Sequence, residues 1–304
     1  LRAVQTFEWI DVPEPSAPAA GEVLVAVHAI GICGTDVSGY LGKMPFIEFP
    51  RVLGHELGVE VLAVGAGVTQ VAVGDRCSVE PYLNCGLCHA CRQGRTNSCM
   101  TLEVLGVHRD GGMCERLILT ASKLHRSARL NFDQLALVET LAIGCHAVER
   151  GAVLKSDDVL IIGAGPIGLS VLEFARLATR RVAVLETNED RRDFVKAHYP
   201  GVIVLQHIPP ECFAQVVFDA TGHAGSMSQT LNYAKFTGRI VFVGITKEPF
   251  ALDDPLLHRR ELTLLASRNA LSADFPRIIG LIESGQIDTR PWISHRTDFN
   301  HLPE

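Results

Sequence analysis

The 304-residue sequence lacks features that nucleic-acid-binding and membrane proteins need. No run of lysine and arginine lines up as a phosphate-binding stripe, and 34 acidic side chains outnumber 28 basic ones, for a net charge of −6. Nucleic acid therefore has no basic stripe to bind. The longest apolar stretch, near residue 160, is broken by glycine and proline and is shorter than the roughly 20 residues of a membrane-spanning helix. We expect a small-molecule partner, no nucleic acid and no membrane segment.

Cysteine is also not spread in pairs along the chain, as a secreted disulfide framework requires. Four of the nine cysteines lie in CGLCHACRQGRTNSC, with the spacing C-x2-C-x2-C-x7-C. Such clustering is typical of a metal site in a reducing compartment, so we expect a cytoplasmic protein. Four thiolates match a closed tetrahedral zinc site, which has no position for a substrate. We predict a structural zinc held by Cys85, Cys88, Cys91 and Cys99.

The apolar pattern changes in the middle of the chain, which is long enough for two domains. Up to about residue 130, short stretches with period-two alternation lie between glycine and proline turns; from about Glu139, continuous apolar strands alternate with helices. The second pattern predicts a parallel sheet covered on both faces, so the fold class is α/β. We expect a β domain at 1–140, a doubly wound domain at 141–267, and a return to the first domain at 268–304. Predicted strands lie at 158–163, 181–186, 202–205, 215–221, 239–244 and 262–267, and predicted helices at 166–179, 189–198, from Ser226 and at 273–284.

A glycine-rich motif follows the first strand of the α/β half. In LIIGAGPIGLS, Gly163, Gly165 and Gly168 form G-x-G-x-x-G around Pro166 and Ile167. The first glycine permits a tight turn, the second lets the backbone approach a pyrophosphate, and the third lets helix and strand pack closely. The free N–H groups of the helix N-terminus then face the phosphates. The motif predicts a dinucleotide site.

Glu186, at the end of the next strand, indicates which dinucleotide binds. Its carboxylate can accept hydrogen bonds from both ribose hydroxyls and would repel a 2′-phosphate, which favours NAD over NADP. Arg191 and Arg192 lie close enough in sequence to weaken that preference, although they equally suit the solvated start of a helix.

An open metal site needs ligands outside the four-cysteine cluster. The candidates are Cys33 in GICGTD, His55 and Glu56 in VLGHELG, and Glu139 in LVETLAIG. Taken singly, each has an ordinary explanation: a packed thiol, a surface pair or a helix residue. We expect the other cysteines to be small core residues, namely Cys77, Cys114, Cys145 and Cys212.

Several motifs in order along the chain resemble the zinc-dependent medium-chain dehydrogenase/reductase (alcohol dehydrogenase) family. They are GICGTD, GHE, the four-cysteine loop, ETLAIGCHA, GAGPIG, DATG and SRNA. The resemblance covers essentially the whole chain and is nearest the branch of sorbitol, threonine and sugar-acid dehydrogenases. It implies a GroES-like catalytic domain with two zinc sites, followed by a Rossmann NAD-binding domain.

The resemblance also implies roles for the candidate ligands. Cys33 and His55 match two ligands of the catalytic zinc, and Glu139 matches the third position, which is glutamate in the polyol branch. Glu56 matches a glutamate that is a direct ligand in some members and lies behind the ligands in others, so the sequence leaves the choice between the two open. Asp36 matches the carboxylate that orients the ligand histidine.

The family mechanism transfers a hydride from an alcohol carbon to NAD while zinc favours ionisation of the alcohol. Thr35 matches the hydroxyl that begins the proton relay. Ser38 stands where many relatives have histidine, and a serine cannot hold the charge of an imidazolium. Arg268 matches a position near the nicotinamide or the substrate.

The resulting hypothesis is an NAD-dependent zinc dehydrogenase that oxidises a secondary alcohol of a polyol, sugar acid or similar metabolite. Two alternatives remain open: an L-threonine-type amino alcohol dehydrogenase, and a non-catalytic dinucleotide-binding zinc protein. The resemblance further implies a homodimer or homotetramer that pairs through the strand at 262–267, and a C-terminal segment that continues past Glu304.

Overall fold

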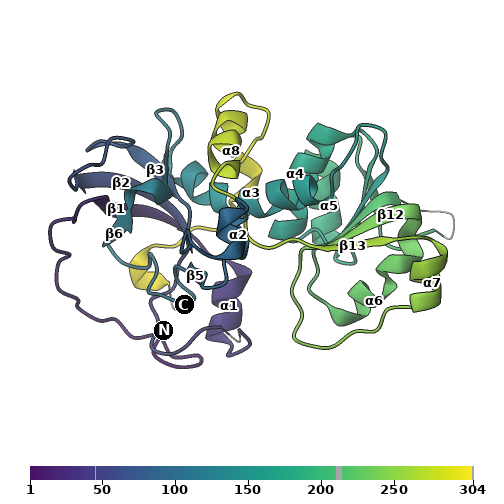
Figure 1. Ribbon diagram of the computed structural model, residues 1–304, viewed down its shortest axis with the longest axis horizontal. Coiled ribbons are helices and arrows are strands. Elements are labelled where there is room, and N and C mark those ends of the chain that lie inside the picture. Colours follow the sequence, from purple (N-terminus) through teal and green to yellow (C-terminus); the bar gives the residue numbers. More distant parts are fainter. Residues whose placement is uncertain (45, 210–213, 303–304) are drawn as a thin grey trace. The chain divides into compact units, whose positions relative to one another are not determined.

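The computed structural model describes residues 1–44, 46–209 and 214–302 (Figure 1). The chain divides into two compact units: one contains Leu1–Glu139 with Leu271–Glu304, and the other contains Thr140–Ala270. The division falls inside helix α3 (Phe132–Arg150). Among the described residues, no helix is both long enough and apolar enough to cross a membrane.

The first unit is built on an antiparallel sheet of five strands in the order β6-β1-β2-β3-β7. In β1, Val23 and Val25 are fully buried whereas the residues between and beside them are only half buried or exposed, which is the alternation expected of a sheet with one face on a core. The strands are β1 (Glu22–Gly31), β2 (Glu56–Val64), β3 (Arg76–Val79), β6 (Arg116–Thr120) and β7 (Leu124–Arg126).

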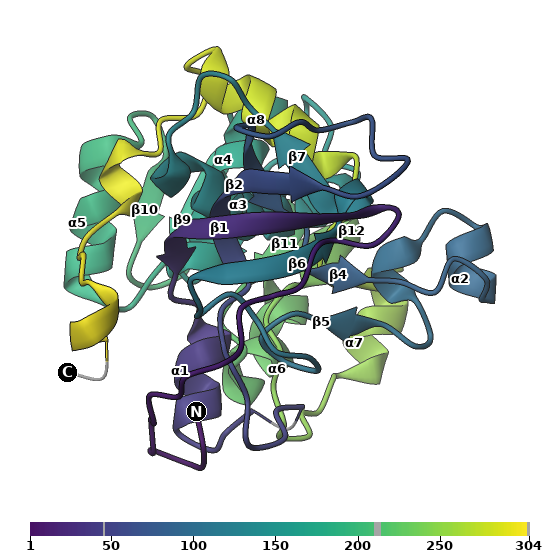
Figure 2. The ribbon, with the colours of Figure 1, turned by 90° about the vertical axis from the view of Figure 1, so that its left-hand side faces the viewer.

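Shorter elements extend this unit. Strands β4 (Tyr82–Leu83) and β5 (Glu103–Val104) form a separate antiparallel pair, and Figure 2 shows them side by side on the way to α2. The other elements are α1 (Gly34–Tyr40), α2 (His89–Arg92), η1 (Thr96–Ser98), η2 (Ala121–Lys123), α8 (Asp274–Glu283), η3 (Arg290–Trp292) and η4 (Phe299–His301). The end of the predicted return segment, residues 303–304, lies outside the described residues.

The second unit is a doubly wound parallel sheet of six strands in the order β10-β9-β8-β11-β12-β13. All four residues of β8 are buried, because helices cover both faces of the sheet: α4 and α5 lie on one side and α6 and α7 on the other (Figure 1). The order reverses between β8 and β11, where sheets of this type bind ligands. The strands are β8 (Val159–Ile162), β9 (Val182–Leu185), β10 (Ile203–Leu205), β11 (Ala214–Asp219), β12 (Ala234–Phe242) and β13 (Thr263–Ala266), and the helices are α4 (Pro166–Ala178), α5 (Glu189–His198), α6 (Ala224–Tyr233) and α7 (Asp254–Arg259).

One strand differs clearly from the sequence prediction. The pattern places a strand at 239–244, but β12 begins at Ala234. The added residues AKFTG are not a continuous apolar run, and Thr237 has a positive φ of 60°. The strand is irregular there, since its register against β11 shifts between Ala214 and Val216. Tertiary pairing rather than local pattern sets this boundary.

Candidate functional site

Pairing of β1 with β2 brings three potential metal ligands together. Gly31, the last residue of β1, lies opposite Glu56, the first residue of β2. Cys33 then caps the start of α1, and His55 immediately precedes β2. As a result, ligand atoms of Cys33, His55 and Glu56 all lie within 4.8 Å of one another.

Gly31 leaves the space that the Glu56 carboxylate occupies. A Cβ atom on Gly31 would lie 2.0 Å from Oε2 of Glu56, far inside van der Waals contact. Glu56 is buried, with 5% of its surface exposed. A glycine at this position therefore keeps the carboxylate beside Cys33 and His55.

The electrostatics of this cluster fit a bound cation. Burial raises the pKa of the Cys33 thiol, against the lowering effect of its hydrogen bond with His55. Burial alone would lower the pKa of His55, but the Cys33 thiol and the charges of Glu139 and Asp36 raise it well above its ordinary value. The raised pKa of His55 shows that thiol and carboxylate groups surround this one buried imidazole. A thiolate, an imidazole and a carboxylate together are a donor set that suits zinc.

Glu139 lies near this cluster but is held by a different partner. It is buried in α3, and the hydroxyl of Tyr82 donates a hydrogen bond to its Oε1 atom. Burial raises the pKa of Glu139, opposed by the nearby His55. Its carboxylate is not part of the close set of Cys33, His55 and Glu56 among the described residues.

Helix α1 carries three residues that the family resemblance assigns to the open site, namely Asp36, Thr35 and Ser38. Oδ2 of Asp36 accepts a hydrogen bond of 2.9 Å from the backbone N–H of Cys33. Its Oδ1 lies 3.8 Å from Nδ1 of His55, which is beyond hydrogen-bond range, and both atoms are buried without a hydrogen-bond partner among the described residues. Thr35 and Ser38 lie on the same helix, and both are half buried.

The four clustered cysteines converge on one point. Ligand atoms of Cys85, Cys88, Cys91 and Cys99 lie within 4.8 Å of one another. Backbone N–H groups point at the sulfurs, for example those of Leu87 and Cys88, each 3.4 Å from Sγ of Cys85, and they lower the pKa of Cys85 to about 6. Inward-facing thiols that accept backbone hydrogen bonds fit a closed, thiolate-bound zinc.

The remaining cysteines and His89 stand apart from this set. His89 is exposed. None of the eight described cysteines forms a disulfide, Cys77 and Cys145 are buried, and Cys114 is half buried. Cys212 lies outside the described residues.

Two glycines of the G-x-G-x-x-G motif are required by the local structure, and the third is uncrowded. Gly163 has a positive φ of 94°, which favours glycine. A Cβ on Gly168 would lie 1.9 Å from the carbonyl oxygen of Gly163, so only glycine allows α4 to pack this closely. A Cβ on Gly165 would meet only Nη1 of Arg191, at 3.7 Å. The backbone before Pro166, the first residue of α4 and neighbour of Ile167, is therefore open to a ligand.

Glu186 lies at the end of β9 and contacts this loop. Its Oε2 accepts a hydrogen bond of 2.7 Å from the N–H of Ala164, and its Oε1 accepts one of 2.8 Å from the N–H of Asn188. Burial alone would raise the pKa of Glu186, but these N–H groups and Arg191, 3.8 Å away, hold it below its ordinary value. The carboxylate is therefore ionised at neutral pH.

The basic residues of the predicted dinucleotide site differ in their surroundings. Of the two neighbouring arginines, Arg191 forms an ion pair with the Glu186 carboxylate among the described residues. Arg192 instead donates to the carbonyl oxygens of Glu186 and Thr187, which ties it to the start of α5. Arg268 follows β13 and is exposed.

Comparison with known proteins matches both units. The alcohol dehydrogenase GroES-like domain matches residues 19–129, and the zinc-binding dehydrogenase domain matches residues 166–284. L-galactonate-5-dehydrogenase of Escherichia coli K12 is 35% identical over 301 residues, which cover 94% of this chain and 87% of the relative. The chain belongs to the zinc-dependent medium-chain dehydrogenase/reductase family.

Further relatives of this dehydrogenase agree. L-arabinitol 4-dehydrogenase of Hypocrea jecorina is 32% identical, with 95% of this chain and 84% of the relative covered. A solved E. coli CFT073 protein described as a short chain alcohol dehydrogenase, in complex with NADH, is 31% identical with a TM-score of 0.91, covering 99% of this chain and 91% of that one. The predicted α/β fold, with a GroES-like and a Rossmann domain, is confirmed, and the chain is an oxidoreductase of the alcohol dehydrogenase class.

Sequence reasoning missed the polar residues around β4 of this dehydrogenase. Glu80, Tyr82 and Asn84 alternate in EPYLNC, and this period of two was the available signal. This alternation does not stand out in the sequence, because it includes Pro81 and because β4 is only two residues long.

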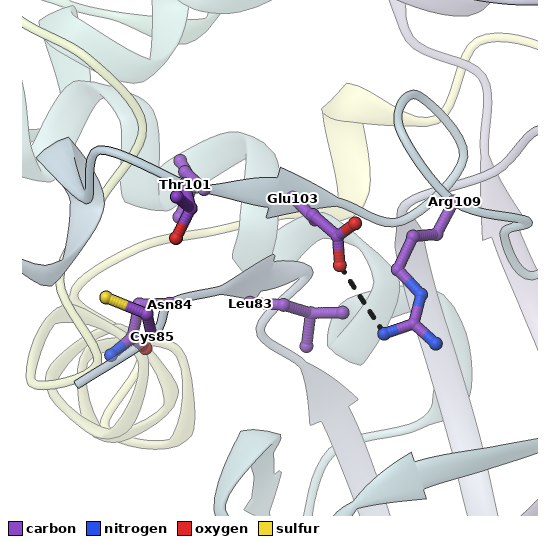
Figure 3. A pocket seen from close by; sticks show the side chains of 7 residues that line it. Leu83, Asn84, Cys85, Thr101, Glu103 and Arg109 are labelled. Atoms are coloured by element: carbon purple, nitrogen blue, oxygen red, sulfur yellow. Dashed lines mark ion pairs between the residues drawn. The ribbon is translucent and has the colours of Figure 1, made fainter. Parts of the chain in front are cut away.

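A surface cavity of about 600 Å³ lies against the β4–β5 pair and next to Cys85. Figure 3 shows it with the ion pair between Glu103 and Arg109, whose charged atoms are 3.5 Å apart. Cys33, His55 and Glu56 are not among the described residues that line it, so it is separate from the open metal site. Its lining consists of Leu83, Asn84, Cys85, Thr101, Leu102, Glu103 and Arg109.

Proposed function

We propose that this dehydrogenase oxidises a secondary alcohol of a sugar acid or polyol with NAD. The convergence of Cys33, His55 and Glu56 supports the proposal most directly, because a purely structural dinucleotide-binding protein has no use for a second, open donor set. The relatives include an L-galactonate-5-dehydrogenase, a 2-dehydro-3-deoxy-L-galactonate 5-dehydrogenase and an L-arabinitol 4-dehydrogenase. All three names specify oxidation at an internal carbon of a polyhydroxylated chain, which supports this substrate class.

The proposal assigns two zinc sites. Cys33, His55 and Glu56 would hold the catalytic ion, with Glu139 beside them, and the four clustered cysteines would hold the structural one. When bound in the open site, zinc supplies the Lewis acidity that favours ionisation of the substrate alcohol.

The chain's own residues then handle the proton and the orientation of the site. The hydroxyl of Thr35 would accept the alcohol proton and pass it on, with Ser38 or water completing the path. Asp36 would hold the position of His55, because its carboxylate faces the second ring nitrogen. Because the hydroxyls of Thr35 and Ser38 cannot keep the proton as a stable charged group, the proton must pass on to solvent.

The dinucleotide would lie on the G-x-G-x-x-G loop, with the ribose hydroxyls donating to Glu186 in place of the Ala164 N–H. Replacing Glu186 by alanine removes the charge that disfavours a 2′-phosphate, whereas Arg191 remains. We expect kcat/KM for NADP relative to NAD to rise at least about tenfold, since like-charge contacts cost more than 1.4 kcal/mol. An unchanged ratio would show that Glu186 does not select the cofactor.

A substrate screen tests the reaction itself. NAD reduction would be followed with aldonates, polyols and L-threonine at neutral and mildly alkaline pH, with Cys33→Ser as the inactive control. Turnover on an aldonate or polyol supports the proposal, and preference for L-threonine supports the amino alcohol alternative. No turnover together with one tightly held zinc would favour the non-catalytic alternative.

We also propose a cytoplasmic homo-oligomer. β13 is the last strand of its sheet, and an edge strand can pair with a second copy of itself. The thiol-rich metal site favours a reducing compartment. Light scattering after size exclusion should give a dimer or tetramer mass at micromolar protein; a monomer mass would contradict the proposal.

A further inference from the structure

Tyr82 is a buried residue between two charged or polar neighbours on the same side of the chain. β4 contains only Tyr82 and Leu83, and just 2% of the surface of Tyr82 is exposed. Glu80 and Asn84 lie two residues away on either side. Because side chains alternate along an extended chain, all three point the same way.

One lysine bridges the two neighbours of Tyr82. Nζ of Lys123 donates to Oε1 of Glu80 at 2.5 Å and to Oδ1 of Asn84 at 3.0 Å. Nε2 of His125 lies 3.3 Å from the other Glu80 oxygen, Oε2. The side chains of Lys123 and Glu80 are 12% and 2% exposed, so this ion pair is shielded from water. It fixes the segment on both sides of Tyr82.

The far end of this segment is attached to the four-cysteine cluster. Nδ2 of Asn84 lies 3.7 Å from Sγ of Cys91, and Asn84 is followed directly by Cys85, as Figure 3 shows. β4 also pairs with β5, where Tyr82 lies opposite Val104. The strand that carries Tyr82 is thus the base of the cysteine-containing loop.

The near end of the segment reaches the open metal site. The Tyr82 hydroxyl donates to Oε1 of Glu139, and both groups are buried. This bond occupies one carboxylate oxygen of Glu139, whose charge acts on the nearby His55 and Cys33. The tyrosine therefore determines how Glu139 presents its charge.

We propose that Tyr82 is a positioning residue for Glu139, and that Asn84, Lys123 and Glu80 make its position depend on the folded four-cysteine loop. The inference rests on the proposed catalytic zinc at Cys33, His55 and Glu56. It gives the closed metal site an indirect role in the reaction: the loop holds Tyr82, Tyr82 holds Glu139, and Glu139 stabilises the neighbouring cation. The two metal sites are then coupled through one strand.

Zinc release tests the first link. Tyr82→Phe keeps the ring and removes the hydroxyl, and Tyr199→Phe is the matched control, because the Tyr199 hydroxyl makes a buried hydrogen bond of 2.9 Å to Glu173 in the other unit. Zinc loss to a chelator would be followed with a colorimetric metal indicator, with NADH fluorescence as the test of an intact dinucleotide site. Glu139 lies behind the ligands in this scheme, and groups in that position typically contribute 10- to 100-fold in metal affinity, so releasing Glu139 from Tyr82 should weaken zinc binding. We expect the zinc of the open site to be the one that the chelator removes more easily. It should leave Tyr82→Phe at least about tenfold faster than it leaves the wild-type protein, and Tyr199→Phe should lose it at the wild-type rate.

Lys123→Met tests the second link and also serves if Tyr82→Phe does not fold. It should accelerate loss of the labile zinc while the four-cysteine zinc is retained. Release at the wild-type rate from folded Tyr82→Phe would overturn the positioning role, and release at the wild-type rate from Lys123→Met alone would overturn the coupling. A wild-type protein that holds a single zinc would overturn the proposed function and this inference with it, whereas two zincs with equal release from all variants would overturn the inference alone.

Discussion

The Glu56 carboxylate occupies the space next to Gly31 that any side chain would need, with Oε2 only 2.0 Å from the position of a Cβ atom. The two residues face each other across the β1–β2 ladder. Cys33 follows Gly31 by two residues, and His55 precedes Glu56 by one. Because Gly31 has no side chain, the Glu56 carboxylate can lie beside Cys33 and His55 in the open site.

Replacing Gly31 by alanine should displace the Glu56 carboxylate. We expect kcat/KM to fall about 10²-fold, the typical effect of a misplacement near 1 Å, and the zinc content to fall from two ions toward one. Gly280→Ala is the control, because a Cβ there meets no atom within 4 Å. Full activity and two zincs in Gly31→Ala would show that Glu56 is not part of the site.

The two metal sites should respond differently to loss of a thiol. Cys91→Ser removes a ligand of the closed site, and we expect a loss of several kcal/mol of folding free energy and a Tm lower by about 10 °C. Cys33→Ser should instead abolish turnover with little change in Tm. Differential scanning calorimetry and metal analysis of both variants check this. A stable Cys91→Ser protein that had lost only catalysis would mean that the roles of the two sites are reversed.

Thr35 and Ser38 lie on the same short helix but should differ in importance. We expect Thr35→Val to lower kcat by about 10²-fold or more, the usual contribution of a group that transfers a proton. Ser38→Ala should have a much smaller effect, since water can replace its hydroxyl. Steady-state kinetics with NAD measure both. Equal, severe losses in the two variants would contradict the proposed relay.

The Glu80–Lys123 pair predicts a pH-dependent part of the stability. Burial alone would raise the pKa of Glu80, but His125 and Lys123 hold it below its ordinary value. The carboxylate therefore stabilises the fold at pH values above its unfolded pKa of about 4.3, and this contribution is lost as the pH falls through the lower folded pKa.

Glu80→Gln should accordingly cost about 3 kcal/mol at pH 7, because it leaves a buried lysine without its counter-charge. The difference from wild type should shrink as the pH falls below about 4. Urea unfolding at several pH values measures it. Glu103→Gln is the control, since the side chains of Glu103 and Arg109 are 51% and 58% exposed and such pairs contribute less than about 1 kcal/mol. A pH-independent difference for Glu80→Gln would contradict the assignment.

The local features of this protein were predictable from the sequence. The spacing of Gly163, Gly165 and Gly168 predicts a strand, a tight turn and a helix, and the structure places all three there. The cysteine spacing predicts a cluster within a single loop, and the four sulfurs do converge. These features depend on residues close in the chain, whose geometry is limited by backbone stereochemistry.

The open metal site was predictable only as a set of candidates. The family resemblance names four candidates, Cys33, His55, Glu56 and Glu139. The sequence does not say which of the two glutamates binds the metal directly. Pairing of β1 with β2 brings Glu56 into the close set, whereas Glu139 is bonded to Tyr82. The identity of the third ligand stays a prediction, which the Gly31 variant tests.

Sequence alone determined the two domains' character, the glycine loop and the cysteine cluster, because period and spacing record contacts between near neighbours. Tertiary structure alone decided which distant residues share a site: Tyr82 meets Glu139 across 57 residues, and Lys123 meets Glu80 across 43. Such contacts leave no periodic trace, since they depend on how strands pair and helices pack rather than on local conformation.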